Sequence, residues 1–145
     1  MPPFERPEVR TKEYRWVSDE KVILDAAAVN GVGNNVDVSQ FRHVCVVIIG
    51  AASPDFTLKC AGSFKHLDDV NFASAASASN PWDFIAMYDY EDASITDGDV
   101  GIVFADSGDI RQFEINTNGI RTLNFIISNY VAGTATVLLY GVNNQ

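Results

Sequence analysis

Histidines, cysteines, serines and aspartates are the residues of this 145-residue chain whose side chains could carry out catalysis. His43 lies in an apolar run, and His66 lies beside a loop of small residues. A Ser-His-Asp triad needs a nucleophile in a defined local setting, such as the G-x-S-x-G turn of hydrolases, and the sequence contains no such setting. Pairing Cys45 or Cys60 with a histidine has no better support. We therefore expect a protein that is not an enzyme and uses no cofactor.

Acidic side chains crowd the segment between residues 89 and 109, where a cation site is conceivable. Calcium prefers several carboxylate and carbonyl oxygens from flexible loops, so Asp97 and Asp99, on either side of Gly98, are the best candidates. Their spacing does not fit the EF-hand loop, and no set of cysteines and histidines suits zinc. We expect a solvated acidic rim and no metal site.

Three aromatic residues of one expected strand could form a platform for a carbohydrate. Trp82, Tyr88 and Tyr90 alternate along residues 82–90 and would share one face. Phe84 and Ala86 lie on that face as well, which favours a core face over an exposed one. Carbohydrate binding is therefore kept as an alternative function.

The charge distribution argues against anionic partners. The net charge is −9, and residues 1–21 contain five basic and five acidic groups, so residues 22–145 carry all of it. Such a body should repel nucleic acid and anionic membranes. The segment Gly31-Val32-Gly33 lacks the following Lys and Ser or Thr of a phosphate loop, and no apolar run approaches the roughly 20 residues that span a bilayer. We expect neither a nucleic-acid nor a membrane partner.

Short β-rich runs separated by turn signals make up the chain from Lys21 onward. About eight runs recur at the spacing of sandwiches and barrels, and no helical periodicity interrupts them. The sequence predicts an all-β fold, an antiparallel β-sandwich of about eight strands that is jelly-roll-like. Within residues 65–81, the stretch Asn71–Asn80 is small, polar and low in complexity, and it is typical of a long crossover loop with or without a helical turn. The expected strands are residues 21–29, 41–49, 56–63, 82–90, 100–104, 110–116, 120–128 and 134–142.

Turn chemistry near the C-terminus predicts a register. A three-residue loop over 117–119, with Gly119 left-handed, would pair Phe113 with Leu123 and Arg111 with Phe125. This register places the apolar residues of both strands on one face. A second tight connection at residues 130–133 would complete a meander of three consecutive strands. Residues 53–55 form another expected turn.

Residues 1–20 form a compositional unit that we expect to be an extended N-terminal arm, with the sandwich domain covering residues 21–145. Prolines at positions 2, 3 and 7 favour an extended backbone. The candidate anchors of such an arm are Phe4, Tyr14, Trp16 and Val17. A disordered tail and an arm that lies on a neighbouring subunit are both open interpretations.

The C-terminal part of the chain resembles small structural proteins of bacteriophage virions with a β-sandwich or jelly-roll fold. The resemblance covers roughly residues 80–145, and it rests on the runs Gly101–Phe104, Arg111–Arg121 and Tyr140–Asn144 together with Leu123, Tyr130, Gly133 and Thr134. These are turn and core positions, so no functional residue transfers.

The resemblance implies an assembly role, as a capsid decoration or cement protein, or as a tail or fibre component. It implies that the partners are other virion proteins, either the major capsid protein or copies of the chain itself in a homo-oligomer. The expected location is the virion, assembled in the cytoplasm of the host bacterium. Two reduced cysteines and the lack of a secretory signal at the N-terminus fit that location.

Overall fold

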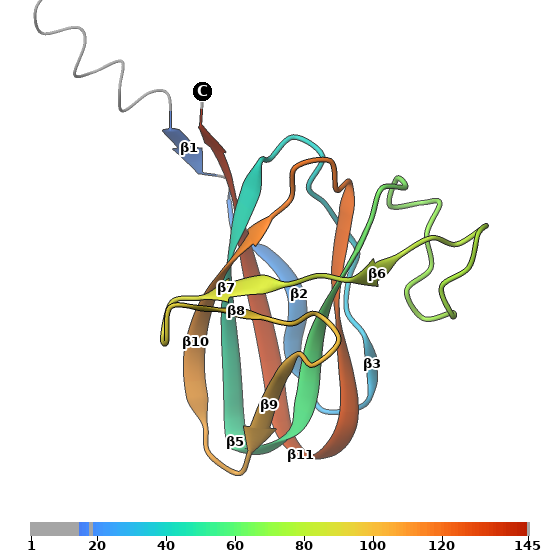
Figure 1. The fold of residues 1–145 in the computed structure, drawn as a ribbon. Helices are drawn as coiled ribbons and strands as arrows, with labels where there is room; N and C mark the ends of the chain where they lie inside the picture. The colour runs from blue at the N-terminus through green and yellow to red at the C-terminus, as the bar shows by residue number, and fades with distance from the viewer. Residues whose placement is uncertain (1–14, 18, 145) are drawn as a thin grey trace, which may run out of the picture.

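The computed structural model describes residues 15–17 and 19–144, which form β-strands and turns without any helix (Figure 1). This confirms the all-β fold predicted from the sequence. Every pairing between the strands is antiparallel. The strands are β1 (Arg15–Val17), β2 (Lys21–Ala27), β3 (Gly31–Val32), β4 (Val36–Asp37), β5 (His43–Ser63), β6 (Asp83–Phe84), β7 (Met87–Asp89), β8 (Ser94–Thr96), β9 (Ile102–Ala105), β10 (Asp109–Asn116) and β11 (Thr122–Asn144).

Two long strands organise the fold. β5 has 21 residues and β11 has 23, and each contains two of the runs expected as separate strands. They pair with each other in two stretches. Residues 43–51 of β5 pair with residues 134–142 of β11, and residues 57–63 of β5 pair with residues 122–128 of β11. Figure 1 shows both strands turning back at the same end of the molecule. The two strands therefore form one ribbon that passes from one layer of the sandwich to the other.

The ribbon reverses where the sequence predicted turns, at residues 51–55 and 129–133. Ala52, Ser53 and Asn129 have positive φ, and the register shifts between Ser128 and Thr134. Gly133 has a φ of +87°, and a Cβ atom there would lie 2.5 Å from the Cα of the opposite strand at position 54. Only glycine allows the two bends to lie this close together.

Each half of the ribbon carries further strands at its edges. The half with residues 43–50 and 134–144 is flanked by β1 and β2 on one side and by β10, β7 and β8 on the other. The half with residues 55–63 and 122–128 is flanked by β3 and β4 on one side and by β6 and β9 on the other. We call these halves the first and the second layer.

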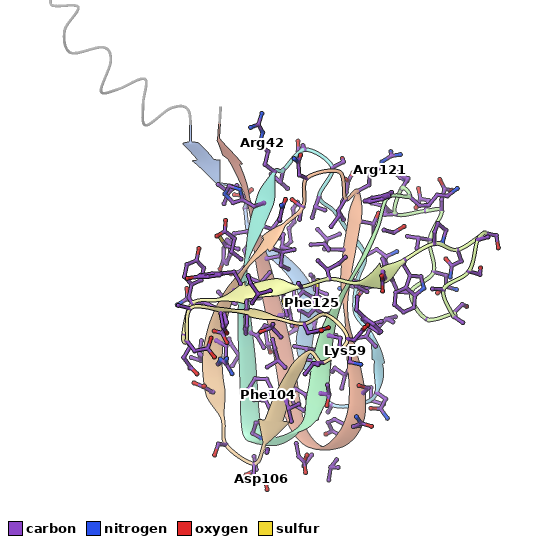
Figure 2. All side chains as sticks on the ribbon, viewed as in Figure 1. Arg42, Lys59, Phe104, Asp106, Arg121 and Phe125 are labelled. Carbon is purple, nitrogen blue, oxygen red and sulfur yellow. The ribbon has the colours of Figure 1, made fainter. Side chains whose placement is uncertain are left out.

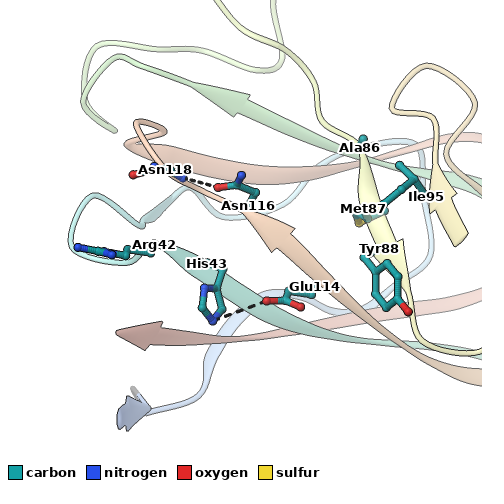
Figure 3. A pocket seen from close by; sticks show the side chains of 9 residues that line it. All are labelled: Arg42, His43, Ala86, Met87, Tyr88, Ile95, Glu114, Asn116 and Asn118. Carbon is teal, nitrogen blue, oxygen red and sulfur yellow. Dashed lines mark hydrogen bonds and ion pairs between the residues drawn. The ribbon is translucent and has the colours of Figure 1, made fainter. Parts of the chain in front are cut away.

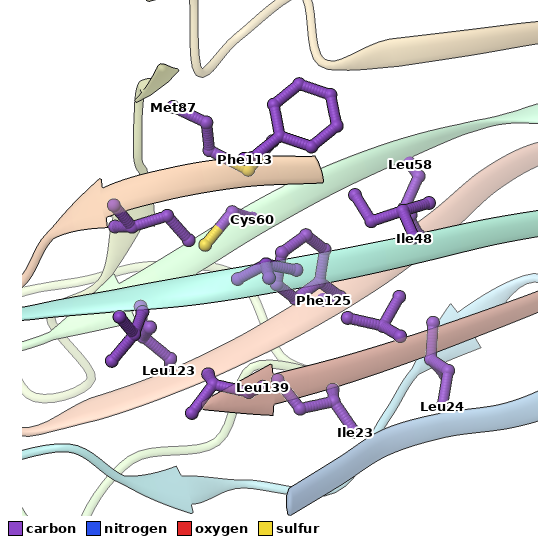
Figure 4. Close-up of a cluster of buried hydrophobic side chains, with 14 of the residues drawn as sticks. Ile23, Leu24, Ile48, Leu58, Cys60, Met87, Phe113, Leu123, Phe125 and Leu139 are labelled. Carbon is purple, nitrogen blue, oxygen red and sulfur yellow. The ribbon is translucent and has the colours of Figure 1, made fainter. Parts of the chain in front are cut away.

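The core lies between the two layers, as the close-up of the buried side chains shows (Figure 4). In β5, Val44, Val46 and Ile48 are buried and the residues between them are half-buried. The first layer therefore has an outer face that nothing in the described chain covers completely. The largest fully buried side chains are Phe56, Phe113, Phe125, Ile23, Ile48, Leu58, Met87, Ile115, Leu123, Ile127, Leu139 and Val38.

The predicted hairpin between β10 and β11 is wrong. Phe113 pairs with Val46 and Asp89, whereas Leu123 pairs with residues 36 and 62 in the other layer. Thr117 is hydrogen-bonded to the segment directly before β5. Its amide donates to the carbonyl of Arg42 at 3.0 Å, and its Oγ1 donates to the carbonyl of residue 41 at 3.0 Å. Because these bonds hold Thr117 in place, the turn Thr117–Ile120 crosses from one layer to the other. Gly119 does adopt a positive φ, +93°. Both strands still turn their apolar residues inward, but from opposite layers.

The expected strand over residues 82–90 is likewise divided. β6 joins the second layer, where Phe84 pairs with Ala61. β7 joins the first layer, where Tyr88 pairs with Glu114. The chain changes layer at residues 85–86, so one predicted strand contributes to both.

Within the described residues no helix is long and apolar enough to cross a membrane. The two ends of the sandwich are easily located in Figure 2, where Arg42 and Arg121 mark one end and Phe104 and Asp106 mark the other. The turn Thr117–Ile120 lies at the end marked by Arg42 and Arg121.

Candidate functional site

The predicted arm anchors fall on both sides of the boundary of the described chain. Phe4 and Tyr14 lie outside the described residues. Trp16 and Val17 belong to β1, where they pair with residues 143 and 142 of β11. Residues 15–17 of the expected arm thus add a strand to the edge of the chain's own first layer.

The three aromatic residues expected on one core face do not form a common platform. The ring of Trp82 packs edge-on against Phe72 and Phe84, with centroids 5.7 and 5.2 Å away. Tyr88 and Tyr90 pack edge-on against each other at 5.1 Å, on the outer side of β7. Tyr90 is 54% exposed, so the expectation of a core face is wrong. The inward positions of β7 are occupied by residues 87 and 89 instead.

A cleft of about 560 Å³ opens at the Arg42 end of the first layer, beside Tyr88 (Figure 3). We call it the polar cleft, because five of its nine lining residues have charged, imidazole or amide side chains. The lining residues are Arg42, His43, Ala86, Met87, Tyr88, Ile95, Glu114, Asn116 and Asn118.

Strand alternation explains why polar groups gather there. Phe113 and Ile115 of β10 point into the core, so Glu114 between them points outward. β10 lies between β5 and β7, and Glu114 stands opposite residue 45 on one side and Tyr88 on the other. Asn116 stands opposite His43. Three strands that are distant in sequence thereby place an acid, an imidazole, an amide and a phenol ring together.

Glu114 is the central acceptor of this group. Its Oε1 accepts a hydrogen bond of 2.9 Å from the hydroxyl of Tyr90, and its Oε2 lies 3.6 Å from Nε2 of His43. The hydrogen bond to the Glu114 carboxylate favours the neutral phenol and, with burial and the nearby negative charge, raises the pKa of Tyr90 to about 12. The cleft thus offers hydrogen-bond donors and acceptors beside an aromatic ring, the chemistry of polar ligand binding.

The lining of the polar cleft contains no serine or cysteine. Cys45 lies opposite Glu114 in the ladder, on the outer side of β5, and Cys60 is buried in the core of the second layer. His66 is on the 65–81 loop, where its Nδ1 accepts a hydrogen bond of 3.2 Å from the amide of Asp68. The structure therefore places His43 next to an acid in a cleft, and it places His66 elsewhere.

The acidic residues at the end of β7 and directly after it have structural partners. Asp89 is buried and forms an ion pair with Nη2 of Arg111, while its other oxygen accepts from the amide of Glu91 at 2.8 Å. Nε of Arg111 lies 3.6 Å from Oε1 of Glu91. The pair anchors the end of β7 to β10 beneath the exposed Tyr90.

The weak calcium candidates Asp97 and Asp99 lie in a turn between β8 and β9. Oδ1 of Asp97 accepts from the amide of Asp99 at 2.8 Å, and the Asp97 carbonyl accepts from the amides of residues 100 and 101. Across residues 15–17 and 19–144, no three His, Cys, Asp or Glu side chains are grouped so that they could hold a metal ion.

A second hollow, of about 870 Å³, lies on the other side of the turn Thr117–Ile120. Its lining is mainly apolar, and we call it the apolar groove. Sequence reasoning identified Trp82 as a possible contact residue but missed Phe64, which is 73% exposed directly after β5. The lining residues are Gly62, Ser63, Phe64, Lys65, Ala76, Ser77, Pro81, Trp82, Asp83, Ile85, Asn118 and Ile120.

The loop of residues 65–81, which forms one wall of this groove, is held by its own hydrogen bonds. The side chain of Asn80 accepts from the amide of Asn71 at 2.8 Å and donates to the carbonyl of Asn71 at 2.8 Å. Val70 and Phe72 are buried against Ala61 in a small separate core. The low-complexity composition thus folds into an ordered loop. It joins β5 to its antiparallel neighbour β6 in the second layer, so the predicted crossover is wrong.

No protein-family model and no curated protein sequence matches the chain. Two solved structures share its fold. The SPBc2 prophage-derived protein YomS superposes with a TM-score of 0.65 at 14% sequence identity, over 89% of this chain and 95% of YomS. The PBSX exported protein XepA superposes with a TM-score of 0.64 at 16% identity, over 89% of this chain and 38% of XepA. The fold thus makes up nearly all of YomS and only part of XepA.

Proposed function

We propose that this chain is a non-enzymatic structural component of a bacteriophage virion, most specifically a capsid decoration or cement protein. The fold likeness to a prophage-derived protein over nearly the whole length of both chains is the observation that carries the proposal. A likeness to part of a second prophage protein supports it. The role agrees with the resemblance between residues 80–145 and phage structural proteins.

In this role the chain binds neighbouring virion proteins, either the major capsid protein or copies of itself, through its N-terminal segment and the faces of the sandwich. The net charge of −9 favours the solubility of the free protein. β1 fastens the base of the N-terminal segment to the sheet edge, so a contact made by residues 1–14 is transmitted to a folded body. Assembly takes place in the cytoplasm of the host bacterium, and the virion is the final location.

The test is incorporation into particles. The full chain and a variant lacking residues 1–14 are each co-expressed with the virion proteins of the same genome, and particles are purified by density gradient. We expect the full chain to sediment with the particles and the truncated chain to remain at the top, with an unchanged circular dichroism spectrum. Particles that never contain the full chain would contradict the virion role. Equal incorporation of the two chains would contradict the role of the N-terminal segment alone.

Carbohydrate binding is the second candidate function, and the polar cleft is the observation that favours it. Tyr88 offers a ring on which the apolar face of a sugar can stack, and Arg42, Glu114 and Asn116 offer groups that can bind its hydroxyls. A glycan array with the full chain, repeated with Tyr88→Ala, tests this candidate. Binding that disappears in the variant supports it, and the absence of any binding at millimolar glycan rejects it.

A further inference from the structure

The apolar groove has an exposed anchor and a firm wall. Phe64 stands at its rim with 73% of its surface exposed, beside Gly119 of the turn. Trp82 forms part of the wall and is held in place by a hydrogen bond of 3.0 Å from its Nε1 to the carbonyl of Ser74. Aromatic side chains that are already fixed lose little freedom when a partner binds, so the groove is suited to a small apolar ligand segment.

The floor of the groove is equally well fixed. Oγ of Ser63 donates to the carbonyl of Pro81 at 2.6 Å and accepts from the amide of Lys65 at 3.0 Å, which ties together the two ends of the 65–81 loop. Ile85 lies directly over Gly62, where a Cβ atom would approach its Cγ1 to 2.9 Å. The groove is therefore part of the folded framework.

The chain itself contains a segment with matching chemistry, outside the described residues. Residues 2–7 read Pro-Pro-Phe-Glu-Arg-Pro. Proline-rich segments favour an extended, preformed backbone and dock into grooves lined by aromatic residues. Phe4 supplies a large apolar side chain of the kind that fills such a groove. The segment is therefore complementary to Phe64 and Trp82.

The charges of the two partners are complementary as well. The groove carries Lys65 and Asp83 in its lining, both exposed. The segment carries the opposite pair, Glu5 and Arg6, directly after Phe4. With Phe4 in the groove, each charge can meet one of opposite sign, which gives the contact a direction and disfavours the reverse orientation.

β1 and the apolar groove lie on different sides of the sandwich. Arg15 of β1 pairs with Asn144 at the end of β11, in the first layer. The apolar groove lies by β6 and the 65–81 loop, on the opposite side of the sandwich from β1 (Figure 1). We propose that the apolar groove of one copy binds residues 2–7 of a second copy. This inference rests on the proposed assembly role of the N-terminal segment and names its partner.

A photo-crosslinking experiment on the full chain tests the contact. Phe4 is replaced by the photoreactive analogue benzoylphenylalanine, and equal amounts of isotope-labelled and unlabelled protein are mixed and irradiated. We expect crosslinked peptides that join position 4 to the groove around Phe64, Pro81 or Trp82, with the two peptides drawn from differently labelled chains. Crosslinks within one chain would overturn the second-copy assignment, and crosslinks elsewhere or nowhere would overturn the contact itself.

Self-association of matched variants gives a second readout. Phe64→Asp should weaken self-association in sedimentation velocity at least tenfold, whereas Val131→Asp, at a residue 69% exposed in the distant bend, should leave it unchanged. Lys65→Glu should weaken it as well, and Glu5→Lys combined with Lys65→Glu should restore it. Equal effects of Phe64→Asp and Val131→Asp, or no rescue by the charge exchange, would overturn the inference.

The two tests separate this inference from the proposed function. If particles require residues 1–14 but position 4 never reaches the groove, the assembly role stands and the segment binds another surface. If position 4 reaches the groove of a second copy but the protein never enters particles, the contact stands and the virion role is wrong. Thermal unfolding of each variant confirms that the exposed substitutions leave the fold intact.

Discussion

Nε2 of His43 and Oε2 of Glu114 lie 3.6 Å apart on neighbouring antiparallel strands of the first layer. The same carboxylate accepts a hydrogen bond from Tyr90, which directly follows β7, the strand on the other side of β10. One acidic side chain therefore connects residues from β5, β10 and the end of β7. The titration of Tyr90 depends on the charge of the Glu114 carboxylate. This dependence can be measured without knowing any ligand.

Titration of Tyr90 follows from this arrangement. The hydrogen bond to Glu114 raises the pKa of Tyr90 from 10 to about 12. Between these values the unfolded chain loses the proton before the folded chain does, so this contribution to stability is complete below about pH 10 and is lost as the pH rises toward 12. The hydrogen bond to Glu20 raises the pKa of Tyr140 as well, so the absorbance of tyrosinate should show a late component that Tyr90→Phe reduces and Glu114→Gln shifts in part toward pH 10. Identical curves for the three proteins would contradict the assignment.

The two cysteines should differ in reactivity. Burial raises the pKa of the Cys60 thiol, whereas Cys45 is half-buried on the outer side of β5. Because the thiolate is the reactive form and the core must open to expose Cys60, its alkylation in native protein should be at least about tenfold slower than that of Cys45. Mass spectrometry of peptides after brief iodoacetamide treatment measures both. Alkylation in urea, where the rates should converge, is the control.

The ion pair between Asp89 and Arg111 should be costly to break from one side. Asp89 is buried, so Arg111→Met leaves a carboxylate without its partner and should lower the free energy of unfolding by about 3 kcal/mol. Replacing both residues, with Asp89→Leu added, should restore part of that loss, because no buried charge remains. Urea unfolding measures the three proteins. A double variant less stable than Arg111→Met would refute this explanation.

Gly133 and Gly119 allow backbone strain to be separated from steric overlap. Both have positive φ, but a Cβ atom at 133 would lie 2.5 Å from the Cα at position 54, whereas at 119 the nearest atom is 4.0 Å away. Gly119→Ala should therefore lower the free energy of unfolding by about 1 kcal/mol, the backbone strain alone. Gly133→Ala should cost about 3 kcal/mol, because the two bends of the ribbon must move apart. Thermal or urea unfolding that ranks the variants the other way would contradict the geometry.

Much of the fold could be predicted from alternation and turn residues alone. Phe113, Leu123 and Phe125 point into the core as expected, and Gly119 has the predicted positive φ. The layer to which each strand belongs could not be predicted in this way. A hairpin within one layer and a connection that crosses between the layers would turn the same residues toward the core. The hydrogen bonds of Thr117 to residues 41 and 42 favour the crossing connection. Local sequence does not contain that contact.

The polar cleft was even less accessible to sequence reasoning. Glu114 could be assigned to the outer face of its strand, because the residues on either side of it are apolar. Its proximity to His43 depends on the register between two strands some 70 residues apart in the chain. The same holds for the apolar groove, where Phe64 and Ile120 come together only because β5 and β11 pair across the second layer.

The edge of the first layer has a mechanical consequence. β1 and β2 follow each other along one side of β11, with register partners from residue 144 down to residue 135. A pull on the N-terminal segment along this direction loads both ladders in shear, so several hydrogen bonds resist it together and cannot be opened one at a time. β11 then carries the force around its bend into the second layer. A subunit tethered through residues 1–14 would bear tension through its whole framework.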